Sequence, residues 1–125
     1  DKPVEFAPLE ISPAIIRVLQ KGMRAVISGS RGTARRYDIK GDGMAGKTGT
    51  VQVRRISKEQ RKKGIVDNID RPWKERDHAL FVGYAPFEKP RYAISVVVEH
   101  GGSGSSMAAP IAKDIMSYVL KQDVA

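Results

Sequence analysis

The chain has 125 residues, 41% of them hydrophobic, and a net charge of +8 from 22 Lys and Arg against 14 Asp and Glu. This length suits one ordinary domain, and no apolar run is long enough to cross a bilayer. The absence of cysteine excludes disulfides and thiolate metal sites, and leaves cytoplasm and periplasm equally open on redox grounds. The opening, Asp1-Lys2-Pro3-Val4, is not a signal peptide. We expect this start to be cut, and any targeting element either lies outside the sequence or does not exist.

The first expected element is an amphipathic helix that begins at Ser12-Pro13 and ends near Gly29. Serine is a good N-cap, and proline fits the first helical position. Residues 29–33 and two further glycines, Gly41 and Gly43, predict turn-rich breaks before the next element. The apolar residues at helical spacing are Ile15, Ile16, Leu19, Met23, Val26 and Ile27.

The stretch Gly-Asp-Gly-Met-Ala-Gly-Lys-Thr-Gly-Thr, residues 41–50, fits two patterns that need different backbones. From Gly41, it matches the Gly-x-x-x-x-Gly-Lys-Thr of a phosphate-binding P-loop. From Lys47, it matches Lys-Thr-Gly-Thr, the third motif of penicillin-interacting serine enzymes. The flanking residues must decide between these two functions.

A P-loop leaves a buried parallel strand and enters a helix. Residues 31–40 are too charged for such a strand, which should be a nearly continuous Val, Ile and Leu run. Residues 50–54 alternate polar with apolar side chains and are rich in β-branched types, which predicts a strand instead of a helix. We therefore expect Lys47 on a strand that begins around Gly46. A P-loop nucleotide-binding module is the alternative.

Residues 54–76 form a long polar excursion, and a connection of this length in a small domain is usually functional or mobile. Its first part, residues 54–63, contains six Lys or Arg and one Glu. It has no aromatic residues for base stacking and fits no nucleic-acid-binding fold, so we expect a solvated loop and no nucleic acid partner. An acidic polymer or an anionic membrane surface stays open as a partner.

Two strands are expected next, over residues 78–85 and 91–100, joined as a hairpin by the proline-flanked residues 86–90. Residues 94–98 are apolar almost throughout, which predicts that the second strand is central and covered on both faces. Because it has only one neighbour along the chain, its other edge should pair with a strand outside this chain or with a second chain.

The last expected element is a helix after the glycine-rich bend at residues 101–104. Ser105 or Ser106 can cap it, and Pro110 is tolerated in its first turn. The whole pattern predicts an α+β fold, in which a three-stranded antiparallel sheet has helices on its faces. The expected apolar stripe of the last helix is Ile111, Ile115, Val119 and Leu120.

Four motifs occur in order: Gly-Lys-Thr-Gly-Thr-Val-Gln at 46–52, Arg-Asp-His-Ala-Leu-Phe at 76–81, Tyr-Ala-Pro at 84–86 and Val-Glu-His-Gly-Gly-Ser-Gly at 98–104. Together with Gly32-Thr33-Ala34, they resemble the C-terminal part of class B penicillin-binding proteins of the elongation type. The resemblance implies the fold of serine β-lactamases and D,D-peptidases, with residues 1–125 as the C-terminal lobe of the transpeptidase domain.

The resemblance implies a peptidoglycan D,D-transpeptidase, which cross-links stem peptides through a serine acyl-enzyme. The nucleophile of such enzymes lies in Ser-x-x-Lys, and none of the nine serines here has Lys three places later. Ser-x-Asn is absent too, since the only asparagine, Asn68, follows Val66. We therefore expect this chain to be inactive alone and the missing N-terminal part of the domain to supply the serine. A serine β-lactamase or D,D-carboxypeptidase of the same fold is a further alternative.

By resemblance, Lys47, Thr48, Gly49 and Thr50 form the substrate-recognition wall. The ammonium of Lys47 would point toward the substrate carboxylate, which the hydroxyls of Thr48 and Thr50 would also bind. Gly49 would permit close approach of the ligand. The backbone N–H of Thr50 would be one of two oxyanion donors. An alternative, purely structural role for Lys47 is to protect an exposed edge strand from pairing with another strand.

The resemblance also implies ligands, partners and a location. The ligands are peptidoglycan stem peptides and β-lactams, and the longer protein would be anchored at the periplasmic face of the bacterial inner membrane beside a membrane glycosyltransferase. We expect no cofactor and no metal, because His100 lacks a second ligand at suitable spacing. Asp77 and His78 should point to opposite faces of a strand, so His78 is expected to be structural. Trp73 is expected to anchor a loop.

Overall fold

The computed structural model describes residues 6–8, 10–41 and 43–122. The opening residues 1–5 and Asp42 of the glycine-rich stretch therefore lie outside the described residues. Among those described, no helix has both the length and the apolar character that a membrane span requires. The main elements are α1 (Pro13–Ser28), β1 (Ala45–Val51), α2 (Lys58–Lys63), β2 (His78–Ala85), β3 (Tyr92–Val98) and α3 (Ala109–Gln122).

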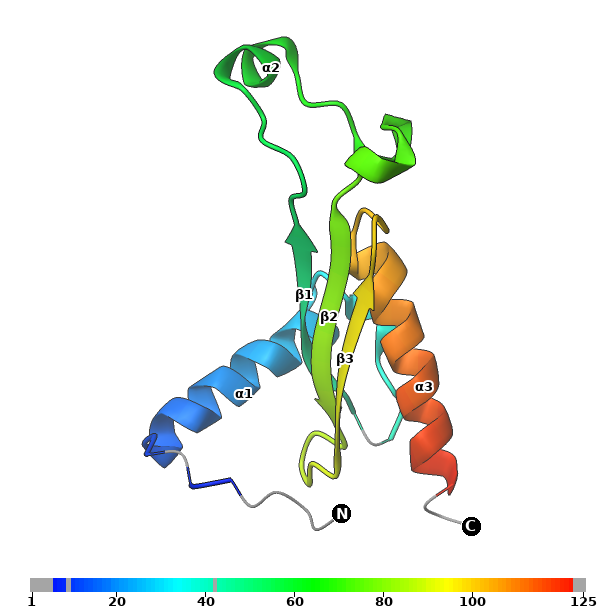
Figure 1. Cartoon of the computed structure of the whole chain (residues 1–125). Helices are drawn as coiled ribbons and strands as arrows, with labels where there is room; N and C mark the ends of the chain where they lie inside the picture. The colour runs from blue at the N-terminus through cyan, green and yellow to red at the C-terminus, as the bar shows by residue number, and fades with distance from the viewer. Residues whose placement is uncertain (1–5, 9, 42, 123–125) are drawn as a thin grey trace.

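The three strands form one antiparallel sheet in the order β1-β2-β3 (Figure 1). This confirms the α+β class, the strand around Lys47 and the hairpin of β2 with β3. The prediction that the last strand is central is wrong for the described residues, where β3 is an edge and Val97 is 59% exposed. A continuous apolar run does not distinguish a central strand from an edge strand whose outer face is bare. A partner for this edge outside the chain stays a prediction.

Helices α1 and α3 cover one face of the sheet. Paired residues of antiparallel strands share a face, and Thr48, Phe81 and Val96 lie side by side across the sheet. Phe81 is fully buried in a core that includes Ile27 of α1 and Met116 of α3. The other face carries Lys47, Val82 and Ser95 in register and no helix among the described residues packs on it. Lys47 therefore lies on the open face.

Helix α1 begins where the sequence predicts. The Ser12 side chain accepts a hydrogen bond from the Ala14 N–H, and Pro13 occupies the first turn. The apolar stripe is buried only at the C-terminal end, since Ile27 is fully buried whereas Ile15 is 55% exposed. The first turns of α1 extend away from the sheet (Figure 1), and Ile15, Val18 and Leu19 are exposed.

Helix α3 departs from prediction at its start and along its stripe. Pro110 lies in the first turn as expected, but neither Ser105 nor Ser106 caps the helix, because residues 104–108 form a π-helical turn that leads into α3. Ile111 and Ile115 are exposed. Of the predicted stripe, Leu120 is buried as expected. Ala109 and Ala112 let the helix approach the sheet closely, and this turns Ile111 and Ile115 outward. The buried residues of α3 are Ala109, Ala112, Met116 and Leu120.

The excursion extends beyond the end of β1 and returns to β2 (Figure 1). The expected solvated loop is wrong for residues 58–63, which form the short helix α2. Ser57 and Gln60 make a capping box: each side chain accepts a hydrogen bond from the backbone N–H of the other residue, at 3.1 and 3.0 Å. Gly64, with φ of 96°, ends the helix.

A buried polar cluster fixes the base of the excursion. Arg71 and Asp77, only 7% and 8% exposed, form an ion pair at 3.3 Å. Asn68 joins them, since its amide donates to Asp77 Oδ2 at 3.1 Å and its carbonyl accepts from the Asp77 N–H at 2.8 Å. Arg71 also donates to the Val66 carbonyl at 2.8 Å. The return of the chain to β2 is therefore held by a connected polar cluster, although the buried Asp77 Oδ1 has no hydrogen-bond partner among the described residues.

Candidate functional site

The candidate site lies along the free edge of β1. Within the described residues β1 pairs only with β2, so its other edge is open. Lys47 and Thr50 are exposed, and Thr48 is half-buried. The register places Lys47 on the open face and both threonines on the helix-covered face. A single ligand can contact all three side chains only if it lies along this free edge.

Lys47 faces a hollow beside the strand. Its Nζ donates a hydrogen bond to the carbonyl oxygen of Thr48 at 2.7 Å, so the ammonium is held against its own strand. The hollow has a volume of about 420 Å³ and lies between β1 and the end of α1. Besides Lys47 it is lined by Gly22, Ala25, Val26, Gly29, Ser30, Arg31, Gly32 and Thr33. A larger hollow of about 670 Å³, against α3, does not include any residue of β1.

Thr33 joins the site through Thr48. The two hydroxyl oxygens lie 2.9 Å apart in a hydrogen bond. The loop that carries Thr33 is fixed to α1, because the N–H of buried Ala34 donates to the Val26 carbonyl at 3.1 Å. Sequence reasoning did not assign Thr33 a role, although Gly32-Thr33-Ala34 was part of the family resemblance. The occurrence of Thr33 in this motif was the sequence signal that could have indicated its role.

An ion pair fixes the start of β1 relative to α1. Arg24 donates to both carboxylate oxygens of Asp38, at 2.7 and 2.9 Å, and to the Met44 carbonyl at 2.8 Å. Asp38 in turn accepts from the backbone N–H groups of Ile39 and Met44. Burial raises the pKa of Asp38, but these hydrogen bonds and the Arg24 charge outweigh it and hold the pKa below its ordinary value of 3.8.

Gly49 and Gly104 pack backbone against backbone behind the motif. A Cβ on Gly104 would collide with the carbonyl oxygens of Gly49 and Leu80, so the turn before α3 rests directly on β1 and β2. A Cβ on Gly49 would lie 3.3 Å from Leu80 Cβ, on the open face. The glycine at position 49 therefore also relieves crowding inside the sheet. Its predicted role toward a ligand stays a prediction.

The remaining candidate residues hold the excursion and lie apart from Lys47. The His100 N–H donates to His78 Nδ1 at 2.9 Å, which gives His78 a structural contact. The Trp73 ring lies against His100, with centroids 4.5 Å apart, and this fits a loop anchor. Asp77 is bound to Asn68 and Arg71. In the part of the chain that the structure describes, no three His, Asp or Glu side chains are grouped to hold a metal.

Comparison with known proteins identifies the class. The family model described as "Penicillin binding protein transpeptidase domain" matches residues 1–117. The chain therefore belongs to the penicillin-binding protein transpeptidase domain family. Its similarities are to class B proteins of the penicillin-binding protein 2 type, and it covers part of their transpeptidase domain.

Two curated relatives are both described as "Peptidoglycan D,D-transpeptidase MrdA". The one from Haemophilus influenzae is 36% identical over 104 residues, which are 82% of this chain and 15% of that protein. The one from Acinetobacter baumannii is 43% identical over 77 residues, 62% of this chain and 11% of that protein. The chain thus spans less than a sixth of the length of these relatives.

Two solved structures have the same fold. Pseudomonas aeruginosa PBP2 in complex with WCK 5153 has a TM-score of 0.66 and 40% identity, and the match covers 87% of this chain and 20% of that one. Helicobacter pylori PBP2 in complex with MreC has a TM-score of 0.66 and 32% identity, and the match covers 87% and 17%. The P-loop alternative is not favoured, because Lys47 lies within β1 and the chain stays extended to Val51.

Proposed function

We propose that residues 1–125 are the C-terminal lobe of a transpeptidase domain, and that the longer protein is a peptidoglycan D,D-transpeptidase acting through a serine acyl-enzyme. One observation carries the proposal: Lys47-Thr48-Gly49-Thr50 is a strand with an open edge beside a hollow, as recognition of an extended peptide requires. The names of the relatives support the reaction, and favour it over a β-lactamase or a carboxypeptidase.

In this proposal the D-alanyl carboxylate of a stem peptide, or the matching carboxylate of a β-lactam, lies at the edge of β1. Lys47 leaves the Thr48 carbonyl and turns its ammonium into the cleft, where a fixed positive charge stabilises the developing oxyanion. The exposed hydroxyl of Thr50 binds the carboxylate. The Thr50 N–H is one oxyanion donor, and loss of such a donor costs about 10²- to 10³-fold in rate.

Thr48 binds the same carboxylate through a hydroxyl that Thr33 orients. A hydroxyl offers one donated and two accepted hydrogen bonds, so the 2.9 Å contact with Thr33 leaves capacity for a ligand. Because Thr33 acts through Thr48, it is a positioning residue.

The partners and the location belong to the longer protein. We propose that it is anchored in the inner membrane with its transpeptidase domain at the periplasmic face, and that it works beside a membrane glycosyltransferase. The Helicobacter pylori relative forms a complex with MreC, so a partner of that kind is proposed here too.

Labelling with a fluorescent penicillin tests the proposal. The 125-residue chain should not form a covalent adduct, because it contains no Ser-x-x-Lys. The longer protein should be labelled, and its Lys47→Ala variant should be acylated at least about 100-fold more slowly while keeping its thermal stability. An adduct on the isolated chain would contradict the assignment of the nucleophile. Unchanged acylation of the Lys47→Ala variant would contradict the role of the ammonium.

A further inference from the structure

Helix α2 and Arg55, which precedes it, carry a cluster of exposed basic side chains. We call Arg55, Lys58, Arg61, Lys62 and Lys63 the basic surface; all five are exposed. Within residues 6–8, 10–41 and 43–122, none of their side chains makes a hydrogen bond or an ion pair. Arg54 differs, because it approaches Glu75 at 3.9 Å.

The arrangement costs α2 stability. Lys58 is three and four residues from Arg61 and Lys62, spacings at which like charges repel on a helix, and only Glu59 offsets this. No residue of α2 is buried, and so short a helix is marginal in water without packing. The capping box keeps it folded all the same. A bound anion would remove the repulsion.

The chemistry of α2 restricts the partner. All six residues of α2 have charged or amide side chains, so the helix itself has no apolar face for insertion into a lipid interface, although Ile65, Val66 and Ile69 beyond it are exposed. No aromatic residue lies among residues 54–63 for stacking on bases. The surface therefore suits a hydrated partner that carries several separate negative charges.

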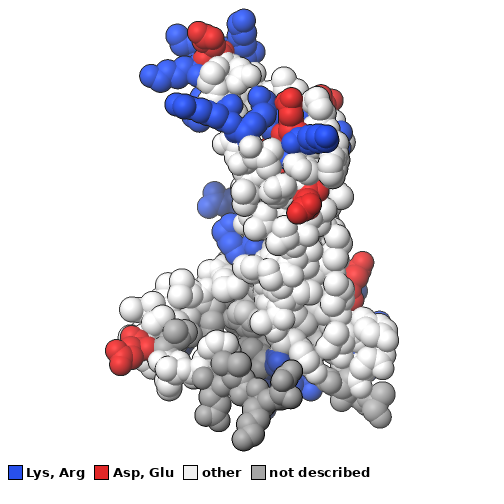
Figure 2. All heavy atoms as spheres, in the orientation of Figure 1, with Lys and Arg blue, Asp and Glu red and all other residues white. Residues whose placement is uncertain are grey.

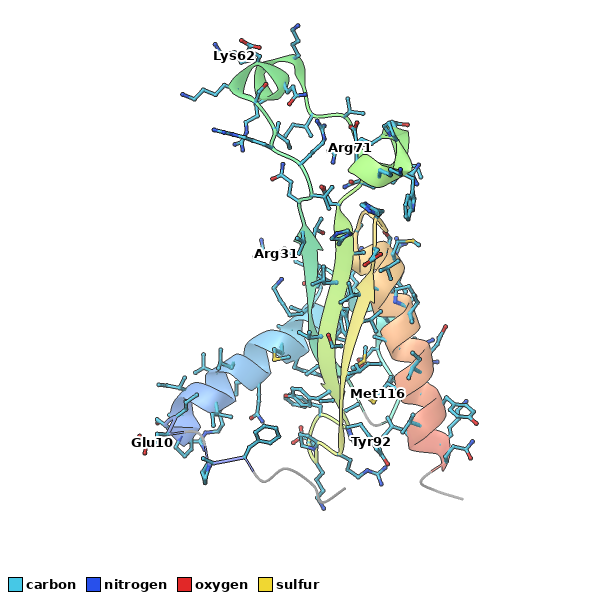
Figure 3. All side chains as sticks on the ribbon, in the orientation of Figure 1. Glu10, Arg31, Lys62, Arg71, Tyr92 and Met116 are labelled. Carbon is cyan, nitrogen blue, oxygen red and sulfur yellow. The ribbon has the colours of Figure 1, made fainter. Side chains whose placement is uncertain are left out.

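The position of α2 relates it to the candidate site. The excursion continues β1 beyond Val51, and Figure 2 shows Lys and Arg side chains gathered at that end of the molecule and again beside the sheet. In Figure 3, Arg31 lies beside β1, and Lys62 lies on α2 beyond the end of the same strand. The buried pair of Arg71 and Asp77 fixes the return of the excursion to the sheet.

We propose that the basic surface binds the stem-peptide carboxylates of a peptidoglycan strand whose reacting peptide lies at the edge of β1. This inference rests on the proposed function. The polymer repeats its peptides along a glycan, so one stem occupies β1 while the carboxylates of neighbouring stems meet the cations of α2. The surface holds the polymer and takes no part in acylation. A small β-lactam does not reach it.

Binding of soluble, uncross-linked glycan strands with intact stem peptides tests this proposal. The full chain should bind them with an affinity that falls as salt rises. The Arg61→Gln/Lys62→Gln/Lys63→Gln variant should bind about tenfold more weakly and with a shallower salt dependence, since each exposed charge contributes modestly. The matched control, Lys40→Gln/Lys89→Gln/Lys121→Gln, removes the same charge elsewhere and should bind as the wild type does. Circular dichroism confirms that both variants fold.

A modified ligand and a further variant test whether the stem-peptide carboxylates are the groups that bind. Glycan strands whose stem-peptide carboxylates have been converted to amides should bind weakly, and a Lys62→Arg/Lys63→Arg variant should keep full affinity for intact strands. Equal loss in the control triple variant, or equal affinity for amidated strands, would overturn the proposal. So would vesicles of phosphatidylglycerol whose binding depends on α2 while strand binding does not.

Different results would contradict the binding role of the basic surface and the proposed function. In the longer protein, the α2 triple variant should react with fluorescent penicillin at the wild-type rate but cross-link glycan strands more slowly. If penicillin labelling fails altogether, the proposed function is wrong. If labelling succeeds and strand affinity does not depend on α2, only this inference is wrong.

Discussion

Arg24 and Asp38 lie fourteen residues apart in sequence and meet in a two-pronged ion pair, with N–O distances of 2.7 and 2.9 Å. The same guanidinium holds the Met44 carbonyl, one residue before β1 begins. It also lies 5.7 Å from the centroid of the Phe87 ring. This one side chain therefore connects α1, the entry to β1 and the β2–β3 turn. The placement of Lys47 relative to α1 depends on it.

Replacing Arg24 with Ala should destabilise the fold by about 1–3 kcal/mol, because a partly buried carboxylate and a backbone carbonyl lose their donor. Urea unfolding of the 125-residue chain measures the change. Arg17→Ala is the matched control, since Arg17 lies exposed on the same helix, and it should have almost no effect. Equal stability of the Arg24 variant and the wild type would show that water replaces the guanidinium without cost.

Stability should fall in acid, partly through Asp38. Its folded pKa lies below the ordinary 3.8, so the carboxylate stabilises the fold above that pH, and this contribution is lost as pH falls through the folded pKa. Asp38→Asn should be less stable than the wild type at neutral pH and should show a flatter stability profile below about pH 4. Thermal melts from pH 7 to 2.5 test this. Parallel profiles for the two proteins would exclude the assignment.

Thr33→Val should slow acylation of the longer protein by about fivefold, as expected for the loss of one hydrogen bond of about 1 kcal/mol. The fold should be kept, because Val closely matches Thr in shape. Thr33→Ser retains the hydroxyl and should restore the rate, which a purely steric role would not predict. Stopped-flow measurement with a fluorescent penicillin gives the rates. A Val variant as fast as the wild type would mean that Thr48 needs no orientation.

Gly104→Ala should destabilise the chain by about 1–3 kcal/mol, because the added methyl group meets the backbone of β1 and β2. Gly22→Ala is a control that should increase the stability of the chain. A Cβ there meets nothing within 4 Å, and alanine in a helix is favoured over glycine by about 0.5–1 kcal/mol. Calorimetric melting temperatures should therefore move apart, and a shift of both variants in one direction would refute the packing argument.

Local sequence patterns predicted the elements whose signals were unambiguous. The alternation after Gly49 gave β1, and Ser12-Pro13 gave the start of α1. The capping box of Ser57 and Gln60 was also a local signal, but the charge density around it favoured a loop. Its residues are three apart, the spacing typical of a helix start.

Tertiary packing determined the side-chain orientations and the strand order that local sequence patterns did not predict. The outward orientation of Ile111 and Ile115 follows from the close contact between α3 and the sheet, which no helical periodicity reveals. The edge position of β3 depends on which strands are present. The candidate residues Lys47 to Thr50 were assigned from the order of the motifs, whereas the hydrogen bond between Thr33, in a turn, and Thr48, in β1, depends on the fold.

The uncovered face of the sheet affects the solution behaviour of the chain. Val82 and Val97 are exposed there, and β3 is an edge strand of the sheet formed by the described residues. Such an edge is a template on which another copy can add its own strand. Purified alone, the chain should therefore dimerise or precipitate as it is concentrated, and dilute samples at low temperature should be the ones that stay monomeric.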